Sequence, residues 1–170
     1  MITAITGGIG SGKTYYCNQL MKQCIEVYDC DREARRLMME DAALQQRINE
    51  TVGSEVFSGG EFHKQLLSEF ILRSEENARL INEVVHPAVA ADFIKSGKQW
   101  LESAILFESG FDRRVPIDRI ICVTAPLEVR IQRIMDRDGI TREKALEWIS
   151  RQMPQEEKAA RADMVVKSEE

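Results

Sequence analysis

The sequence has 170 residues, of which 44% are hydrophobic and 30% are charged, and its formal net charge at pH 7 is -5. This composition is typical of one globular domain with room for a small insertion, and it excludes a disordered chain. The acidic balance argues against a general nucleic-acid binder or a membrane-surface protein. We therefore expect a small-molecule substrate, with no nucleic acid and no membrane as partner.

The cysteines form no C-x-x-C pair and no zinc spacing with histidine, which predicts free thiols in a reducing compartment; they are Cys17, Cys24, Cys30 and Cys122. The N-terminus lacks a basic segment followed by a long apolar run. No stretch approaches the roughly 18 apolar residues of a membrane helix. We expect a cytoplasmic protein, either a monomer or a weak homo-oligomer.

In chain order, β-prone segments at residues 2–6 and 25–28 predict two short strands, with a helix over 13–24 between them. Asp31 is placed to cap a helix that runs to Met39. Residues 41–95 are expected to form several helices, broken near Gly53 and again at 58–60. Within this block, Pro87 should start or kink a helix.

The second half of the chain predicts strands at residues 100–108, 119–123 and 164–166. Between them we expect a helix from Pro126 to Met135, a helix over 141–152 capped by Thr141, and a short helix opened by Pro154. Strands that alternate with helices in this way indicate an α/β fold, with a parallel sheet covered on both faces.

Residues 7–14 read Gly-Gly-Ile-Gly-Ser-Gly-Lys-Thr and match the phosphate-binding pattern G-x-x-x-x-G-K-[ST]. Glycines let the backbone turn so that several N–H groups point at one anion, and the following helix directs its positive end to the same place. Lys13 is expected to reach the β- and γ-phosphates, and the Thr14 hydroxyl to bind Mg²⁺. The predicted ATP-binding residues are Gly8, Ile9, Gly10, Ser11, Gly12, Lys13, Thr14 and Tyr15.

A phosphate loop does not by itself define a reaction. A switch GTPase would need a guanine-reading N-K-x-D or T-K-x-D segment, and neither is present. A small-molecule kinase needs a carboxylate beside the γ-phosphate, to orient the acceptor hydroxyl and take its proton. Asp29 and Asp31 close the second strand, where the two-residue period would put both on one face at the ligand-binding edge. The alternative is that Asp31 only caps a helix and Asp29 is solvated.

A kinase also needs cationic charge over the transferred phosphoryl group. Arg130, Arg133 and Arg137 recur at helical spacing, and Asp138-Gly139 follows as a plausible hinge. Such a row is usually a solvated helix face. Its position late in a phosphate-loop chain instead favours a mobile lid that supplies arginines, among which Arg137 is the candidate for catalysis.

These segments together resemble the dephospho-CoA kinase family. The carrying motifs are Thr6-Gly-Gly-Ile-Gly-Ser-Gly-Lys-Thr14, Val27-Tyr-Asp-Cys-Asp31, Val85-His86-Pro87, Leu106-Phe107-Glu108, the segment from Arg133 to Gln152, and Ala162 to Val166. The resemblance covers nearly the whole chain in order. It implies a P-loop NTPase fold similar to nucleoside monophosphate kinases, and ATP- and Mg²⁺-dependent phosphorylation of the ribose 3′-hydroxyl of dephospho-CoA, the last step of coenzyme A synthesis.

The resemblance also implies three parts: a nucleotide-binding core at residues 1–40, 98–136 and 153–170, a helical CoA-binding subdomain at 41–97, and a lid at 137–152. It places Asp31 as general base and His86 in the substrate region, with Lys64 as a further substrate contact. We expect Lys13 and Arg137 to act with Asp31 in catalysis, and we also assign Asp29, Glu108 and Arg133 to the substrate. From chemistry alone, His86 before a proline is more often structural than a ligand contact.

Three departures from the family pattern stand out. Ala104 replaces the proline of P-L-L-F-E, and Lys64 stands where the family has arginine, which keeps the charge but loses the bidentate fork. The family's I-x-N-x-G run and final helix have no counterpart after Val166, so we expect part of the adenine pocket to be missing. Two rival functions remain open: another small-metabolite kinase, for a nucleoside monophosphate or a sugar acid, and a nucleotide-binding module without catalysis.

Overall fold

The computed structural model describes residues 1–168, so the last two residues of the predicted core segment 153–170 lie outside it. The chain forms two compact units. We call Met1–Asp29 together with residues 97 onward the sheet unit, and Cys30–Ser96 the helical unit. Across residues 1–168, every helix is too short or too polar to span a bilayer.

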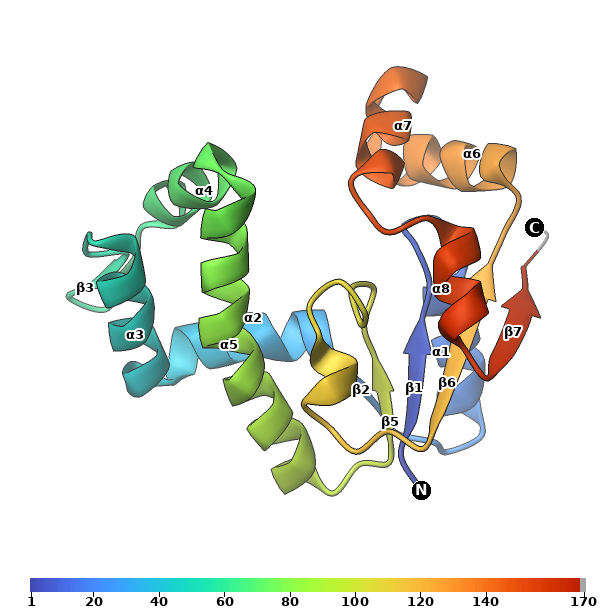
Figure 1. Ribbon diagram of the computed structural model, residues 1–170, viewed down its shortest axis with the longest axis horizontal. Coiled ribbons are helices and arrows are strands. Elements are labelled where there is room, and N and C mark those ends of the chain that lie inside the picture. Colours follow the sequence, from blue (N-terminus) through green and yellow to red (C-terminus); the bar gives the residue numbers. More distant parts are fainter. Residues whose placement is uncertain (169–170) are drawn as a thin grey trace. The chain divides into compact units, whose positions relative to one another are not determined.

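The sheet unit is built on five parallel strands in the order β2-β5-β1-β6-β7 (Figure 1). Their bounds are β1 Thr3–Thr6, β2 Val27–Asp29, β5 Trp100–Glu102, β6 Arg119–Thr124 and β7 Met164–Lys167. The central strand β1 is wholly buried. Because all five strands run the same way, the loops that follow them meet at one edge of the sheet, where ligands bind in α/β folds.

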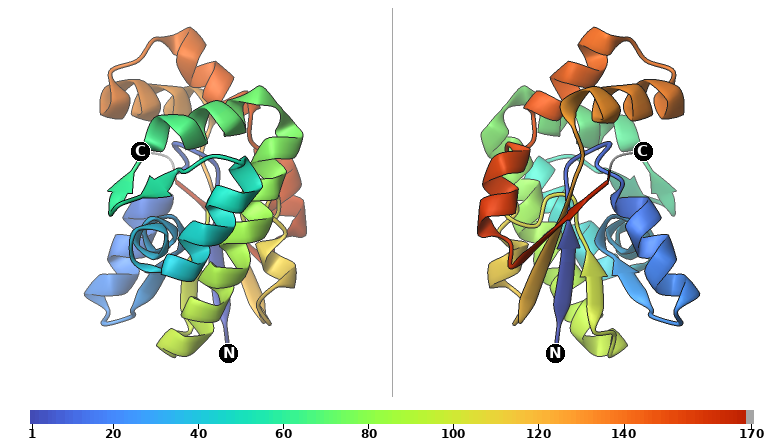
Figure 2. Two further views of the ribbon diagram at one scale, coloured as in Figure 1. Left: turned by 90° about the vertical axis from the view of Figure 1, so that its left-hand side faces the viewer. Right: turned by 90° about the vertical axis from the view of Figure 1, so that its right-hand side faces the viewer.

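The helices of the sheet unit are α1 Lys13–Lys22, α6 Leu127–Asp138, α7 Arg142–Ser150 and α8 Gln155–Arg161, with a short 3₁₀ turn at Phe111–Arg113. Helices α1 and α8 cover opposite faces of the sheet (Figure 2). Under α1 lies an apolar cluster that includes Ile5, Leu20 and Val123. Helices α6 and α7 lie beyond the carboxyl ends of the strands (Figure 1).

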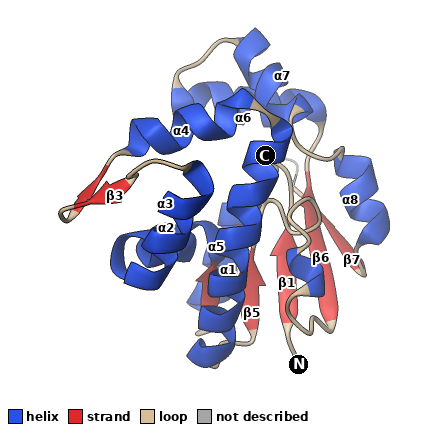
Figure 3. Ribbon diagram, turned by 60° about the vertical axis from the view of Figure 1, so that its left-hand side comes forward, coloured by secondary structure: helices blue, strands red, loops and turns tan. Residues whose placement is uncertain are grey.

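The helical unit contains α2 Cys30–Glu40, α3 Ala42–Val52, α4 Lys64–Arg73 and α5 Glu75–Ser96. The long helix α5 packs against the other three and buries Val85, Val89 and Phe93 (Figure 3). A hairpin of β3 Phe57–Ser58 and β4 Glu61–Phe62 joins α3 to α4. The side-chain amide of Asn49 makes two hydrogen bonds of 2.9 Å with the backbone of Phe57, and this fixes the hairpin on α3.

The α/β class, the parallel sheet and most elements agree with the sequence predictions. Four details differ. The strand expected over 100–108 ends at Glu102, because residues 104–110 form turns. The hairpin around Gly59-Gly60 was not predicted, and α5 runs through Pro87, so this proline does not start a helix. Helix α2 groups with the helical unit rather than with the core, because it packs on α3 and α5.

Candidate active site

The phosphate-binding pattern forms a tight loop between the central strand β1 and helix α1. Gly10 and Gly12 have φ angles of 78° and 95°, which side-chain-bearing residues rarely adopt. The helix begins at Lys13 directly after this turn, and the N–H of Ser11 folds back onto the carbonyl of Gly8 at 3.1 Å. The unpaired N–H groups of the first helical turn therefore face the carboxyl edge of the sheet, which makes it an anion site.

The side chain of Lys13 is held by Glu102, the last residue of β5. The distance from Nζ to Oε1 is 2.5 Å, and the two side chains are 14% and 13% exposed. Glu102 is paired in register with Asp29 on β2 and with Ile5 on β1, so it stands between the second strand and the loop. The sequence analysis missed Glu102, although an acid at the end of a strand that borders the loop strand was the available signal.

The Cys17 thiol in α1 lies against the same carboxylate. Burial raises the pKa of this thiol well above its ordinary value, and the negative charge and hydrogen bond of Glu102 raise it further. Cys17 therefore stays neutral and acts as a small packed side chain in the apolar cluster under α1.

Two arginines of α6 contact the phosphate loop directly. Arg130 is 5% exposed, and its Nε donates to the carbonyl oxygen of Ile9 at 3.0 Å. Its guanidinium fills the space beside Gly8, where a Cβ would come within 2.2 Å of Nη2. Burial lowers the pKa of Arg130 from its ordinary value. Arg133 donates to the carbonyl of Gly10 at 3.2 Å and to the Ser168 hydroxyl at 3.0 Å.

Arg137, the third arginine of the row, is placed differently. Its side chain is 60% exposed and its guanidinium bonds Asp138, the next residue, at 2.7 and 2.9 Å. The structure thus brings Arg130 and Arg133 to the loop, while Arg137 stands at the solvent-facing end of α6. Helical spacing put the three on one face but did not indicate which of them reach the loop.

Glu108 contacts the segment that follows α7. Its Oε2 accepts from the backbone N–H of Met153 at 3.2 Å and lies 3.0 Å from Nζ of Lys158. The Lys158 side chain is fully buried in α8, where its ammonium also donates to the carbonyl of Ala104 at 2.6 Å. Burial lowers the pKa of Lys158, and the Glu108 carboxylate opposes this shift. No sequence signal singled out Lys158, because a lysine on a short charged helix normally faces water.

A cavity of about 570 Å³ opens beside the loop in the sheet unit. Its lining residues are Gly12, Tyr15, Tyr16, Gln19, Val123, Val166, Lys167 and Ser168. The volume and the mixed apolar and aromatic lining suit a nucleoside. Because Gly12 belongs to both the loop and the cavity wall, a nucleotide can occupy the two together.

The comparison with known protein families agrees with this geometry. Residues 1–170 match the family described as "Dephospho-CoA kinase". The chain belongs to the dephospho-CoA kinase family. The "Dephospho-CoA kinase" of Bacteroides fragilis (strain YCH46) is 38% identical over 173 residues, which cover 95% of this chain and 82% of that protein. The corresponding protein of Fusobacterium nucleatum is 32% identical over 176 residues, with 99% and 89% covered.

Solved structures of other proteins share the fold of this chain. The crystal structure of TT1252 from Thermus thermophilus has a TM-score of 0.82 at 32% identity and covers 99% of this chain, which spans 88% of that one. Dephospho-CoA kinase from Campylobacter jejuni has a TM-score of 0.66 at 21% identity, with the same coverage. Shikimate kinase from Acinetobacter baumannii reaches 0.53 at 16% identity, with 99% and 83% covered. The last two show a common P-loop kinase fold.

Three residues that the family pattern assigns to catalysis or substrate lie in the helical unit. Asp31 is in the first turn of α2, Lys64 begins α4, and His86 is partly buried within α5. Helix α2 begins at Cys30, directly after β2 ends at Asp29. Two parts of the sequence prediction are therefore corrected: Asp31 lies inside the helix rather than capping it, and strand alternation does not relate it to Asp29.

The residues around the loop fit Mg²⁺ as a companion of a triphosphate. Within residues 1–168, no cluster of three or more His, Cys, Asp or Glu side chains could hold a metal ion. The hydroxyls of Thr6 and Ser11 are buried and have no hydrogen-bond partner in this part of the chain. Thr14 adds an exposed hydroxyl in the first turn of α1. Mg²⁺ prefers oxygen ligands and keeps several waters, so one hydroxyl with phosphate oxygens is a suitable donor set.

Proposed function

We propose that the protein transfers the γ-phosphoryl group of ATP to the ribose 3′-hydroxyl of dephospho-CoA, with the Gly8–Thr14 loop as the triphosphate site. The observation that carries this proposal is the match to the dephospho-CoA kinase family over residues 1–170, together with a well-formed loop that ends at a partly buried, paired Lys13. Dephospho-CoA phosphorylation is the last step of coenzyme A synthesis. We further propose that the enzyme acts as a monomer or a weak homo-oligomer.

The sheet unit supplies the binding and the positive charge. The loop N–H groups hold the phosphates, Tyr15 adds its backbone N–H at the α-phosphate, and Lys13 offsets charge on the β- and γ-oxygens. Mg²⁺, bound through the Thr14 hydroxyl, would neutralise the triphosphate and screen charge on its oxygens. The cavity beside Gly12 takes the nucleoside. Residues 137–152 form the lid, whose Arg137 turns from Asp138 to the phosphoryl oxygens when the acceptor binds.

Asp31 is proposed as the general base that orients and deprotonates the ribose hydroxyl. It follows Asp29 by two residues, so covalent geometry keeps its Cα within about 7 Å of the carboxyl end of β2. Its side chain is exposed, as a carboxylate that receives a substrate proton must be. Asp29 assists from the end of the strand, and Lys64 and His86 bind the dephospho-CoA body.

The deciding experiment is ADP release from ATP with and without dephospho-CoA. We expect release to require dephospho-CoA, and nucleoside monophosphates or shikimate not to replace it. Release stimulated by one of these other acceptors would favour a rival kinase. Binding of ATP without any stimulated release would favour a non-catalytic module.

The role of Asp31 is tested by Asp31→Asn, which keeps the shape but removes the base. We expect kcat to fall by about 10²- to 10⁴-fold. Asp136→Asn is the matched control, because Asp136 is exposed on α6 and accepts a hydrogen bond from the neighbouring Gln132 at 2.8 Å. Near-normal turnover of Asp31→Asn would remove this residue from the role.

A further inference from the structure

Ile9, in the middle of the phosphate loop, contacts the α6–α7 region through its N–H, its carbonyl and its side chain. Its N–H donates to Oε1 of Gln152 at 2.8 Å, and its carbonyl accepts from Nε of Arg130 at 3.0 Å. Its side chain packs against a buried cluster formed by Ile131, Ile134 and Ala145. Both peptide groups of this residue and its side chain are therefore held by one region of the fold.

The glycines on either side of Ile9 pack closely against neighbouring elements. A Cβ on Gly8 would lie 3.3 Å from Oε1 of Gln152, and a Cβ on Gly10 would lie 2.7 Å from the carbonyl oxygen of Arg130. The loop backbone thus approaches α6 more closely than a side chain would allow, and it lies close to Gln152. The position of the loop is therefore coupled to that of α6 and Gln152 by close packing.

Gln152 itself stands in a tethered segment. It follows the end of α7 at Ser150 by two residues, and the N–H of the next residue, Met153, donates to Glu108. Glu108 is in turn paired with the buried Lys158. The connection between α7 and α8 is therefore fixed at Met153 on one side and bonded to the phosphate loop through Gln152 on the other.

We propose that Gln152 is a positioning residue for phosphoryl transfer, which holds the Ile9 peptide so that the following N–H groups converge on the phosphates. The proposal rests on the proposed function. Ile9 precedes the turn that leads into the first helical turn, whose N–H groups form the anion site, so the angle of its peptide sets the direction of the loop that follows. Misplacement of a reacting group by about 1 Å can cost 10²-fold in rate, so a single bond at this point carries kinetic weight.

The chain offers a matched control in Gln155, three residues further along. Its side-chain amide also bonds one backbone residue, accepting from the N–H of Ala125 at 3.0 Å and donating to the Ala125 carbonyl at 3.0 Å. Gln155 thus makes comparable bonds with a backbone residue at the end of β6 that is not part of the loop. A purely structural effect should appear equally in both positions, whereas a positioning effect should appear only at Gln152.

The experiment compares Gln152→Ala, Gln152→Glu and Gln155→Ala in the full chain. Steady-state ADP release gives kcat and both KM values, and thermal unfolding ensures that all variants are assayed while folded. We expect Gln152→Ala to lower kcat about tenfold with KM for dephospho-CoA within about twofold. Gln155→Ala should keep kcat within about twofold despite a comparable loss of Tm.

Gln152→Glu keeps an acceptor oxygen for the Ile9 N–H but adds a negative charge near the triphosphate. We expect it to recover kcat to within about threefold of the unaltered protein while KM for ATP rises several-fold. If Gln152→Ala does not fold, the kinetic constants of Gln152→Glu test the proposal instead. Equal kinetic losses in Gln152→Ala and Gln155→Ala, or an unchanged kcat in Gln152→Ala, would overturn the inference. Absence of turnover in the unaltered protein would instead overturn the proposed function.

Discussion

Lys13 and Glu102 form an ion pair of 2.5 Å at the carboxyl edge of the sheet, with both side chains largely shielded from water. The pair joins the phosphate loop to β5, a strand that lies next to β1. It therefore pre-positions the only side chain of the loop that carries a positive charge. In a shielded site such a pair is sensitive to the loss of one partner, because the remaining charge stays without compensation.

The first prediction concerns the stability supplied by this pair. We expect Glu102→Gln to lower the free energy of unfolding by about 1–3 kcal/mol, because the amide still accepts from Lys13 but no longer neutralises it. Urea unfolding followed by circular dichroism measures the change. Glu128→Gln is the control: its side chain is 71% exposed and pairs with Arg142 on the surface, where solvent screening should make the loss clearly smaller. Equal losses in the two variants would show that shielding does not matter here.

The second prediction is a pH dependence that arises from Cys17. Burial and Glu102 raise the pKa of this thiol, so the folded protein keeps a proton that the unfolded chain loses above its ordinary pKa of about 8.5. The stability that the neutral thiol contributes is fully present below that pH and decreases as the pH rises above it. Between about pH 9 and 11 we expect a decline of up to roughly 1.4 kcal/mol per pH unit from this group.

The measurement is urea unfolding of the protein and of Cys17→Ala across this pH range. The variant loses some core packing at every pH, but its stability should decline less steeply above pH 9. Cys24→Ser serves as control, because Cys24 is exposed, and it should keep the slope of the unaltered protein. A Cys17→Ala curve parallel to that of the unaltered protein would exclude this thiol as the source.

Much of the sheet unit could be predicted from the sequence, because its local signals and its long-range pattern agree. The glycine-rich motif lies between β1 and α1 as expected, and Thr141 caps α7 by accepting from the N–H of Lys144 at 3.2 Å. The strand β5 was overestimated, since the apolar run after Glu102 that includes Leu106 and Phe107 is buried in turns. An apolar run indicates burial, but not which backbone geometry achieves it.

The site was less predictable, because its contacts depend on how whole elements are oriented. The row from Arg130 to Arg137 lies on one helix face, yet only its first two members reach the loop, since only the part of α6 that carries them lies against it. Gln152 was marked only as the end of a segment that resembles the family's lid, because a hydrogen bond to Ile9 across 143 positions leaves no local pattern that would give its role. The hairpin at Gly59-Gly60, by contrast, did have a local signal, because paired glycines are typical of tight hairpin turns. The sequence analysis interpreted these glycines only as a break between helices.

The third prediction separates a structural role of Glu108 from the substrate contact that the sequence analysis assigned to it. We expect Glu108→Gln to lower the free energy of unfolding by about 2–3 kcal/mol, because the buried Lys158 ammonium loses its carboxylate. Adding Lys158→Met should restore part of this loss, since no uncompensated charge then remains in the interior. KM for dephospho-CoA should stay within about twofold once the variants are assayed while folded. A raised KM with unchanged stability would instead support direct contact with the substrate.

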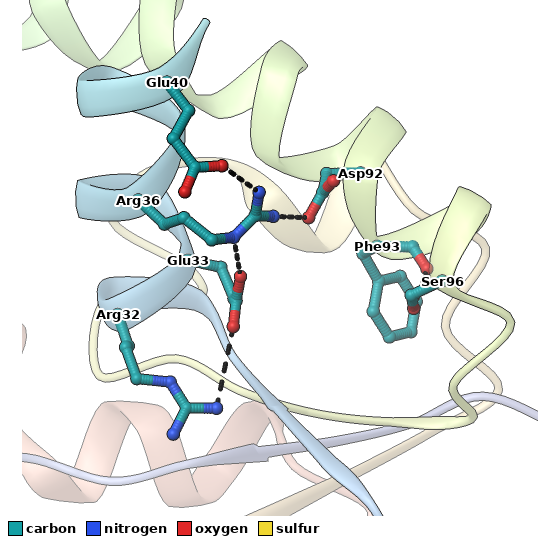
Figure 4. A network of polar contacts seen from close by, with 7 residues as sticks. All are labelled: Arg32, Glu33, Arg36, Glu40, Asp92, Phe93 and Ser96. Atoms are coloured by element: carbon teal, nitrogen blue, oxygen red, sulfur yellow. Dashed lines mark hydrogen bonds and ion pairs between the residues drawn. The ribbon is translucent and has the colours of Figure 1, made fainter.

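The fourth prediction concerns the helical unit, where Arg36 of α2 lies among three carboxylates (Figure 4). Its Nη2 donates to Asp92 of α5 at 2.6 Å, while Glu33 and Glu40 of its own helix hold the rest of the guanidinium. These hydrogen bonds raise the pKa of Arg36, so the side chain is charged at every working pH. The pair with Asp92 is thus a tertiary link between α2 and α5, on a guanidinium that its neighbours have already oriented.

A double-mutant cycle with Arg36→Ala and Asp92→Ala tests this link, with free energies of unfolding from urea titration. We expect a coupling energy of about 0.5–1.5 kcal/mol, because the network orients the arginine before it meets Asp92. The control cycle uses Arg79 and Glu83, an exposed pair within α5. Solvent screens pairs of this local kind, so a clearly smaller coupling energy is expected there. Since Asp31 lies on the same helix as Arg36, a loss of α2 docking should also lower kcat in the Arg36→Ala variant. Coupling energies that do not differ between the two cycles would mean that the network adds nothing to the docking of α2.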